Sequence, residues 1–131
     1  RAPTIKDAVS EVVDCIDVYM SEGGCGWLAA VVKIRKHDEG DSKKAIEAAL
    51  AGHRSMKMVT IVDEDIDIGN PVRVEWAMVT RWQPDRDTYI YSDQKGSSLD
   101  PSRYEDGKTS KVGFDATIHH GDNPEGYQSV Q

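Results

Sequence analysis

The sequence predicts an α/β fold: a single sandwich-like domain whose mixed β-sheet is covered by helices on one or both faces, with an irregular C-terminal tail. Three observations lead to this prediction. The chain has 131 residues, enough for one domain with a hydrophobic core and too few for two ordinary domains. Segments with helical periodicity alternate with short Val- and Ile-rich segments, in the order α-β-β-α-β-α-β. From Ser92 onward, glycines and prolines interrupt the chain repeatedly.

The N-terminal part is predicted to form a helix followed by two paired strands. Apolar residues recur at helical spacing over residues 4–12, whereas residues 13–20 alternate loosely and residues 27–36 are rich in Val and Ile. Residues 21–26 contain three glycines, which permit the positive φ angles of a turn. We therefore expect the two strands to pair back on each other through this turn.

The middle of the chain is predicted to add a helix and a buried strand. Asp41 or Ser42 is placed to cap a helix that continues through Leu50 and is ended by Gly52. Residues 56–62 form a short apolar run, which is typical of a strand beneath helices.

A further helix is predicted to begin at Asn70 and Pro71, because Asn is a favoured cap and Pro is favoured at the first helical position. Residues 88–91 form the last clear strand. The chain from Ser92 is predicted to be a mostly irregular tail that wraps a neighbouring subunit or domain. The buried face of the helix is expected to comprise Val72, Trp76, Val79 and Thr80.

The charge balance argues against several kinds of partner. Sixteen Lys and Arg residues stand against 23 Asp and Glu, a net charge of −7, so we expect neither nucleic acid nor an anionic membrane surface. The longest apolar run, residues 27–32, is far shorter than the roughly 20 residues of a membrane span.

The chain opens without the apolar stretch of a secretory signal, so Cys15 and Cys25 are expected to be reduced in a cytoplasmic protein. Because residue 1 is Arg, we interpret the chain as a processed product or a piece of something longer.

An acidic segment follows the predicted strand at 56–62. Asp63, Asp65 and Asp67 have the spacing of the first calcium ligands of an EF-hand, but Ile68 and Val74 stand where that loop needs Gly and Glu. We interpret these acids as side chains that interact favourably with the dipole of the next helix, with calcium binding as the weaker alternative. The carboxyl edge of an α/β sheet is also where ligands collect.

Histidines near the C-terminus offer a second possible metal site. His119 and His120 lie close to Asp115 and Asp122 in the sequence, but the spacing places no third ligand. A solvated tail is therefore the favoured interpretation. Two further histidines, in predicted turns, are also expected to be exposed: His37 and His53.

The sequence contains no complete catalytic set. It has no nucleophile elbow, P-loop or Ser-His-Asp order. The glycines of residues 23–26 lie between two predicted strands, so they lack the helix N-terminus that binds phosphate. Cys25 within this turn has no identifiable base, and we interpret it as a turn residue.

A series of motifs nevertheless resembles one family. The segments, in this order, are Val62–Ile68, Val74–Ala77, Thr80-Arg81, Gln83–Asp87, Gly96–Ser102 and Lys111–Thr117, with Gly23–Gly26 and Gly40–Ala45 upstream. Their order and gaps resemble the C-terminal domain of UbiD-type decarboxylases, which use prenylated FMN to add or remove CO2 on aromatic and α,β-unsaturated acids. The resemblance covers residues 1–118 and leaves residues 119–131 as an irregular tail.

The resemblance implies that the chain is part of an enzyme. It would be the C-terminal, oligomerising and active-site-closing part, or a small subunit, of a UbiD-like decarboxylase or carboxylase. It would be inactive without the flavin-binding domain or large subunit, which would hold the prenylated FMN and its divalent metal. The chain would then form a homo- or hetero-oligomer. The alternative is a stand-alone oligomerisation or scaffold module without catalysis.

The resemblance also implies one group of site residues. Gly96, Ser97, Ser98 and Leu99 correspond to a family loop that faces the substrate pocket, and the small Ser97 would leave room for a ring. A simple turn is the alternative interpretation. No residue of the chain corresponds to the family's catalytic, cofactor-binding or metal-ligating residues.

Overall fold

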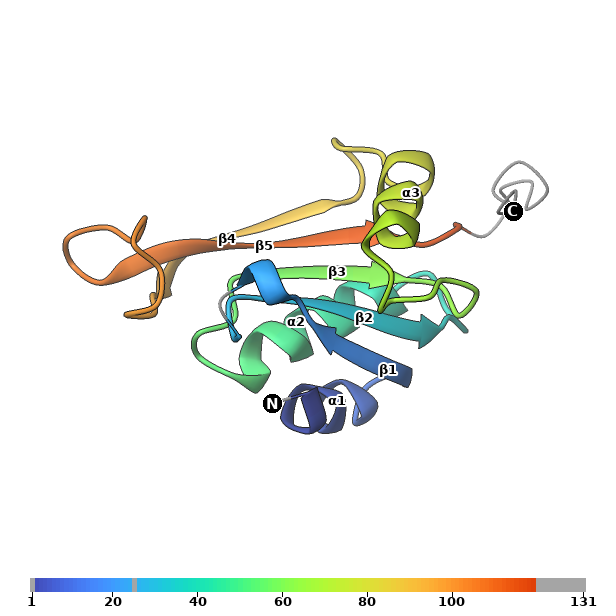
Figure 1. Ribbon diagram of the computed structural model, residues 1–131, viewed down its shortest axis with the longest axis horizontal. Helices are drawn as coiled ribbons and strands as arrows, with labels where there is room; N and C mark the ends of the chain where they lie inside the picture. The colour runs from blue at the N-terminus through green and yellow to red at the C-terminus, as the bar shows by residue number, and fades with distance from the viewer. Residues whose placement is uncertain (1, 25, 120–131) are drawn as a thin grey trace.

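The structure is a computed structural model that describes residues 2–24 and 26–119. Five strands form one mixed sheet in the order β1-β2-β3-β5-β4 (Figure 1). Strands β2, β3 and β5 are parallel, while the edge strands β1 and β4 run antiparallel to their neighbours. The strands are β1 (Asp14–Met20), β2 (Ala29–Arg35), β3 (Met58–Val62), β4 (Thr88–Lys95) and β5 (Lys108–Ala116). The helices are α1 (Ala2–Ser10), η1 (Glu22–Gly24), α2 (Asp41–Gly52) and α3 (Pro71–Arg81).

Helices cover both faces of the sheet, which confirms the predicted α/β sandwich. Helices α1 and α2 pack on one face and α3 on the other (Figure 1). The alternation of side chains along β3 explains this division, because Val59 and Ile61 join the core under α1 and α2, whereas Val62 joins the core under α3. Strands β1 and β2 pair as predicted from the intervening glycine turn.

Strand β5 corrects the prediction that the chain is mostly irregular from Ser92 onward. It lies between β3 and β4, and β4 itself continues to Lys95. The two strands form a long hairpin whose far end projects beyond the rest of the sheet (Figure 1). Residues 120–131, the greater part of the predicted tail, lie outside the described residues.

The buried face of α3 also differs from the prediction. Val72 and Val79 are each 71% exposed, whereas Ala77 and Arg81 are buried. The reason is that Arg81 is drawn toward two carboxylates at the end of β3, and this interaction fixes the rotation of the helix. Trp76 is half-buried beside it.

One predicted helix cap is confirmed and one is wrong. Asn70 Oδ1 accepts a hydrogen bond from the Val72 N–H at 3.0 Å, at the start of α3. Helix α2 instead begins after Gly40, and Asp41 lies within its first turn. The Asp41 carboxylate accepts hydrogen bonds from the backbone N–H groups of the preceding turn. No helix within the described residues is long and apolar enough to cross a membrane.

Candidate functional site

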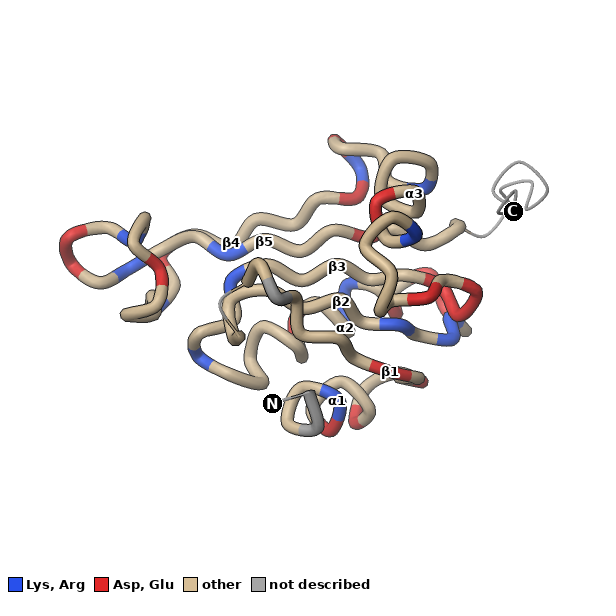
Figure 2. Tube along the Cα trace, viewed as in Figure 1, with Lys and Arg blue, Asp and Glu red and all other residues tan. Residues whose placement is uncertain are grey.

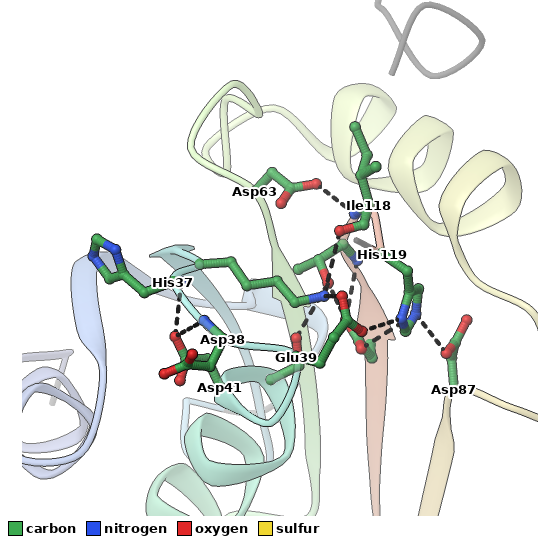
Figure 3. Close-up of polar contacts among 12 residues, drawn as sticks. His37, Asp38, Glu39, Asp41, Asp63, Asp87, Ile118 and His119 are labelled. Carbon is green, nitrogen blue, oxygen red and sulfur yellow. Dashed lines mark hydrogen bonds and ion pairs between the residues drawn. The ribbon is translucent and has the colours of Figure 1, made fainter. Parts of the chain in front are cut away.

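A cluster of charged side chains surrounds His119 at the carboxyl edge of the parallel strands (Figure 3). His119 Nδ1 lies 2.8 Å from Glu39 Oε2, and Nε2 lies 2.9 Å from Asp87 Oδ1. Asp115 Oδ2 is 3.6 Å from the same Nε2. The side chains of Asp87 and Asp115 are 1% and 2% exposed, so the two carboxylates are almost fully withdrawn from water.

The ends of three strands and a loop build this cluster. Asp115 belongs to β5, and its N–H donates to the carbonyl of Asp87, just before β4. Beyond β5, Thr117 donates from its N–H and hydroxyl to Asp115 Oδ1. Lys36, just after β2, donates to Thr117 Oγ1 and lies 3.4 Å from Glu39. The cluster thus ties the chain after β5 to the loop before α2.

The Asp87 carboxylate is held in its charged form. Burial alone would raise the pKa of Asp87, but hydrogen bonds from Arg86 and Gln83, with the charge of His119, outweigh burial and lower it. Arg86 donates two hydrogen bonds to this carboxylate, one to each oxygen, both at 2.9 Å. The Gln83 N–H donates to Asp87 Oδ2 at 2.8 Å.

The expectation of a solvated His119 is therefore wrong. Its side chain is only 17% exposed, and Asp115 approaches it as the sequence spacing allowed. Two other partners of His119, Glu39 and Asp87, lie 80 and 32 residues away along the chain, so local spacing could not reveal them. His120, Asp122 and Cys25 lie outside the described residues.

The other two described histidines and the described cysteine lie outside this cluster. The side chain of His37 is 62% exposed, as predicted. His53 is only partly exposed, because its ring stacks on Trp27 with the ring centres 3.7 Å apart. Cys15 is a free thiol, and burial raises its pKa.

The acids that follow β3 bind an arginine rather than lying against the N-terminus of α3. Arg81 Nη1 donates to Asp63 Oδ2 at 2.9 Å, and its two terminal nitrogens make paired contacts of 2.9 and 2.8 Å with Asp65. Burial raises the pKa of Asp63, although the Ile118 N–H and Arg81 oppose this. The hydrogen bond from Arg81 lowers the pKa of Asp65. Figure 2 shows acidic residues of this loop close to basic residues at the end of β2, where Glu64 pairs with Arg35 at 3.3 Å.

The predicted substrate loop lies at the opposite end of the molecule, beyond β4 (Figure 1). Ser97 is buried, donates its hydroxyl to Ser55 Oγ at 2.9 Å and accepts from the Leu99 N–H at 3.1 Å. Ser98 and Leu99 are exposed. A Cβ at Gly96 would lie 2.6 Å from the carbonyl oxygen of Gly107, so only glycine fits there. Within this loop, Ser98 and Leu99 are thus the side chains open to contact.

We expect the ion pair between Lys57 and Asp100 to hold this loop in place. Lys57 Nζ lies 2.7 Å from Asp100 Oδ2, and its hydrogen bond lowers the pKa of Asp100 to about 2. Lys57→Met should lower the free energy of unfolding by about 1.5–3 kcal/mol at pH 7, measured by urea denaturation. Because the pKa of Asp100 is lower in the folded than in the unfolded state, where it is about 3.9, this loss should shrink as the pH falls from about 4 toward 2.

The control for this prediction is Lys108→Met. Lys108 forms an exposed pair with Asp93 at 2.9 Å, with side-chain exposures of 50% and 76%, and should lose under about 0.5 kcal/mol. Equal losses in the two variants would contradict the role given to the Lys57 pair.

An open apolar groove lies between α3 and the sheet. Its volume is about 340 Å³. Its apolar lining comprises Tyr19, Val31, Met58, Ile68, Pro71, Val74, Met78 and Phe114. Met58 is 43% exposed, so this part of the sheet lacks the cover that α1 and α2 give the other face.

Comparison with known proteins identifies the family. Residues 1–116 match the family described as 3-octaprenyl-4-hydroxybenzoate carboxy-lyase C-terminal domain. The anhydromevalonate phosphate decarboxylases of Methanothermobacter thermautotrophicus and Methanosarcina mazei are 50% and 51% identical to the chain over 118 and 115 residues. These alignments cover 89% and 88% of the chain but only 28% and 27% of the relatives.

Solved structures agree with the sequence relatives. The UbiD-class enzyme HmfF from Pelotomaculum thermopropionicum, in complex with FMN, superimposes with a TM-score of 0.92 at 37% identity, covering 98% of the chain and 29% of HmfF. Vanillic acid decarboxylase from Sedimentibacter hydroxybenzoicus, in open form, superimposes with a TM-score of 0.81 at 26% identity. The match covers 99% of the chain and 28% of the decarboxylase chain. The chain thus spans less than a third of the length of these relatives, and it belongs to the UbiD family of carboxy-lyases, whose C-terminal domain it matches.

Proposed function

We propose that this chain is the C-terminal part, or a small subunit, of a UbiD-like decarboxylase or carboxylase and is inactive without the flavin-binding part. The observation that carries the proposal is the match of 89% of the chain to a decarboxylase at 50% identity, over only 28% of that enzyme. In such an arrangement the chain would contribute oligomer contacts and closure over the active site, which exclude water and position the substrate.

The substrate class we propose is an aromatic or α,β-unsaturated carboxylic acid. Relatives in both classes support it, since the solved structures include vanillic acid and 3,4-dihydroxybenzoic acid decarboxylases. The relatives at 49–51% identity are named for anhydromevalonate phosphate, the dehydrated form of mevalonate phosphate and therefore an unsaturated acid. Anhydromevalonate phosphate is accordingly the first substrate to test.

The proposed cofactor is prenylated FMN with a divalent metal, held by the flavin-binding part. Related enzymes have been solved with FMN and with prFMN. The N-termini of α2 and α3 do not suit a flavin phosphate, because each already has a polar or acidic group of this chain. Asn70 caps α3, and the acidic Asp41 lies in the first turn of α2.

Two surfaces support a role in docking and closure. The apolar groove beside α3 offers an uncovered surface of the kind that packs against another domain. The loop between β4 and β5 exposes Ser98 and Leu99, whose side chains are therefore open to contact with a neighbouring domain or subunit.

The proposal is tested by purifying the protein from its native source and measuring its intact mass, absorption spectrum and CO2 release. We expect a flavin-bearing sequence joined to this chain or copurifying with it, and turnover that the isolated chain lacks. Bound flavin and turnover in the isolated chain would overturn the proposal. A colourless oligomer of 14.5 kDa chains without a flavin-bearing partner would instead support the scaffold alternative.

Leu99→Ala is expected to reduce kcat/KM of the assembled enzyme without unfolding it. The side chain is 44% exposed, so its truncation should change the free energy of unfolding by less than about 1 kcal/mol. Loss of a pocket contact should raise KM by roughly 10-fold, the scale of one or two buried methylene groups. Ser97→Ala is the control for a change in the structure of the loop, because the Ser97 hydroxyl donates a hydrogen bond to Ser55 within the chain. Unchanged kinetics in Leu99→Ala would remove the pocket role.

A further inference from the structure

We propose that His119, Asp87 and Asp115 bind a divalent transition-metal ion at the carboxyl edge of the sheet. Figure 3 shows His119 and Asp87 pointing toward one another. One ligand atom from each residue lies within 4.8 Å of the others. His119 Nε2 is 2.9 Å from Asp87 Oδ1 and 3.6 Å from Asp115 Oδ2. Ligand atoms of a tetrahedral zinc site are about 3.3 Å apart, given metal–ligand bonds of about 2.0–2.2 Å. The two separations from His119 Nε2 bracket that value.

In each of the three proposed ligands, the side-chain nitrogen or oxygen that would not bind the metal is already held by another residue. Glu39 lies 2.8 Å from His119 Nδ1, which leaves Nε2 facing the two carboxylates. Thr117 donates to Asp115 Oδ1, and Gln83 donates to Asp87 Oδ2. Outer contacts of this kind, above all a carboxylate on the far nitrogen of a histidine, orient the ligands of known metal sites.

The two buried carboxylates and the imidazole face one another closely. Asp115 Oδ2 lies 3.6 Å from His119 Nε2, beyond hydrogen-bond reach, and its side chain is 2% exposed. A metal ion between His119, Asp87 and Asp115 would bridge these atoms.

The local charge also calls for a cation. The three carboxylates of Glu39, Asp87 and Asp115 face two permanent cations: Lys36, which pairs with Glu39, and Arg86, which pairs with Asp87. Arg86 Nε donates to Asp87 Oδ1, which leaves that oxygen a second lone pair. Among these described groups the acidic charges thus outnumber the basic ones, which favours a bound cation.

The donor set indicates which ion. One imidazole nitrogen with two carboxylate oxygens suits Zn²⁺, Co²⁺ or Mn²⁺ better than Mg²⁺ or Ca²⁺, which prefer oxygen alone. Three protein ligands leave a coordination position for water or a further ligand. The proposal does not rest on the proposed enzymatic function.

The test is titration of the 131-residue chain with Co²⁺, followed by visible absorption, and with Zn²⁺, followed by calorimetry. We expect a Co²⁺ spectrum of nitrogen and oxygen ligation that Zn²⁺ abolishes. His119→Gln and Asp115→Asn should each weaken binding at least 10-fold, and Glu39→Gln about 10-fold as an outer contact. His37→Gln is the matched control, because this exposed histidine pairs with Asp14 outside the cluster.

Circular dichroism and the shift of Tm by Zn²⁺ keep the test decisive if a variant is less stable. Zn²⁺ should raise the Tm of the wild-type chain and of His37→Gln but not of His119→Gln. The proposal is overturned if the wild-type chain binds neither ion. It is equally overturned if His119→Gln and Asp115→Asn retain wild-type affinity, or if the Co²⁺ spectrum shows thiolate ligation.

Discussion

Gly113→Ala is expected to lower the free energy of unfolding by about 3 kcal/mol, and more if the core cannot relax. Gly113 lies in β5, directly beneath helix α2. A Cβ built there would lie 2.2 Å from Ile46 Cγ2 and 2.8 Å from Cγ1 and Cδ1. Ile46 is fully buried, so its side chain has little space in which to move away. Urea denaturation with an unchanged m-value would measure the loss.

A second substitution shows whether this single contact is responsible. Ile46→Ala alone should cost about 2–5 kcal/mol through the cavity that it leaves. In that background Gly113→Ala should cost far less than in the wild type, because the methyl group enters the vacated space. The double variant should then lose less free energy of unfolding than the sum of the losses in the two single variants. An equal cost in both backgrounds would contradict the steric explanation.

Gly40→Ala is the glycine control. Gly40 has a φ of −75°, and a Cβ at this position would meet no heavy atom within 4 Å. Its substitution should change the free energy of unfolding by less than about 0.5 kcal/mol. The contrast separates the loss of space at Gly113 from any general effect of replacing glycine.

The close approach at Gly113 explains why β5 could not be found by periodicity. The buried positions that alternate along this strand are Thr109, Lys111, Gly113 and Asp115, and the only buried apolar side chain of the strand is that of its last residue, Ala116. Each is satisfied by a specific tertiary contact instead. Lys111 Nζ, for example, donates to the carbonyl of Arg54 at 3.0 Å, while Gly113 admits Ile46. An alternation of polar and apolar residues predicts a strand only when its buried face is apolar.

The parts of the fold and site that depend on local interactions could be predicted from the sequence, whereas those that depend on tertiary contacts could not. Asn70 and Pro71 marked the start of α3 because a cap is a local interaction. The face that α3 buries depends on Arg81, whose partners are 16 and 18 residues away. The His119 cluster likewise joins residues from three segments of the chain, residues 36–39, 83–87 and 115–119. The motif series did indicate the family, because it compares whole segments rather than single periodicities.

Arg81→Met is expected to lower the free energy of unfolding by about 3–5 kcal/mol at pH 7, measured by urea denaturation. The guanidinium is completely buried, and its removal leaves Asp63, only 18% exposed, as a charge without its main counter-ion. Asp65 is 48% exposed and can be solvated, so it contributes less to the loss. Arg73→Met is the control, because Arg73 lies over the same Trp76 ring, at 5.2 Å, and should cost less than about 1 kcal/mol.

The pH dependence of Arg81→Met identifies the carboxylate that causes the loss. Burial already raises the pKa of Asp63, and removal of Arg81 takes away an opposing charge, so the pKa should rise further. A group whose folded pKa is raised stabilises the protein below its unfolded pKa of about 3.9, and this stabilisation is lost as the pH rises through the folded pKa. The loss caused by Arg81→Met should therefore be greater at pH 7 than at pH 4.

Adding Asp63→Asn removes the buried charge while keeping an acceptor for the Ile118 N–H, so the double variant should be more stable than Arg81→Met at pH 7. If the loss is the same at both pH values and Asp63→Asn recovers nothing, the cost lies in packing around Trp76 rather than in an unpaired carboxylate.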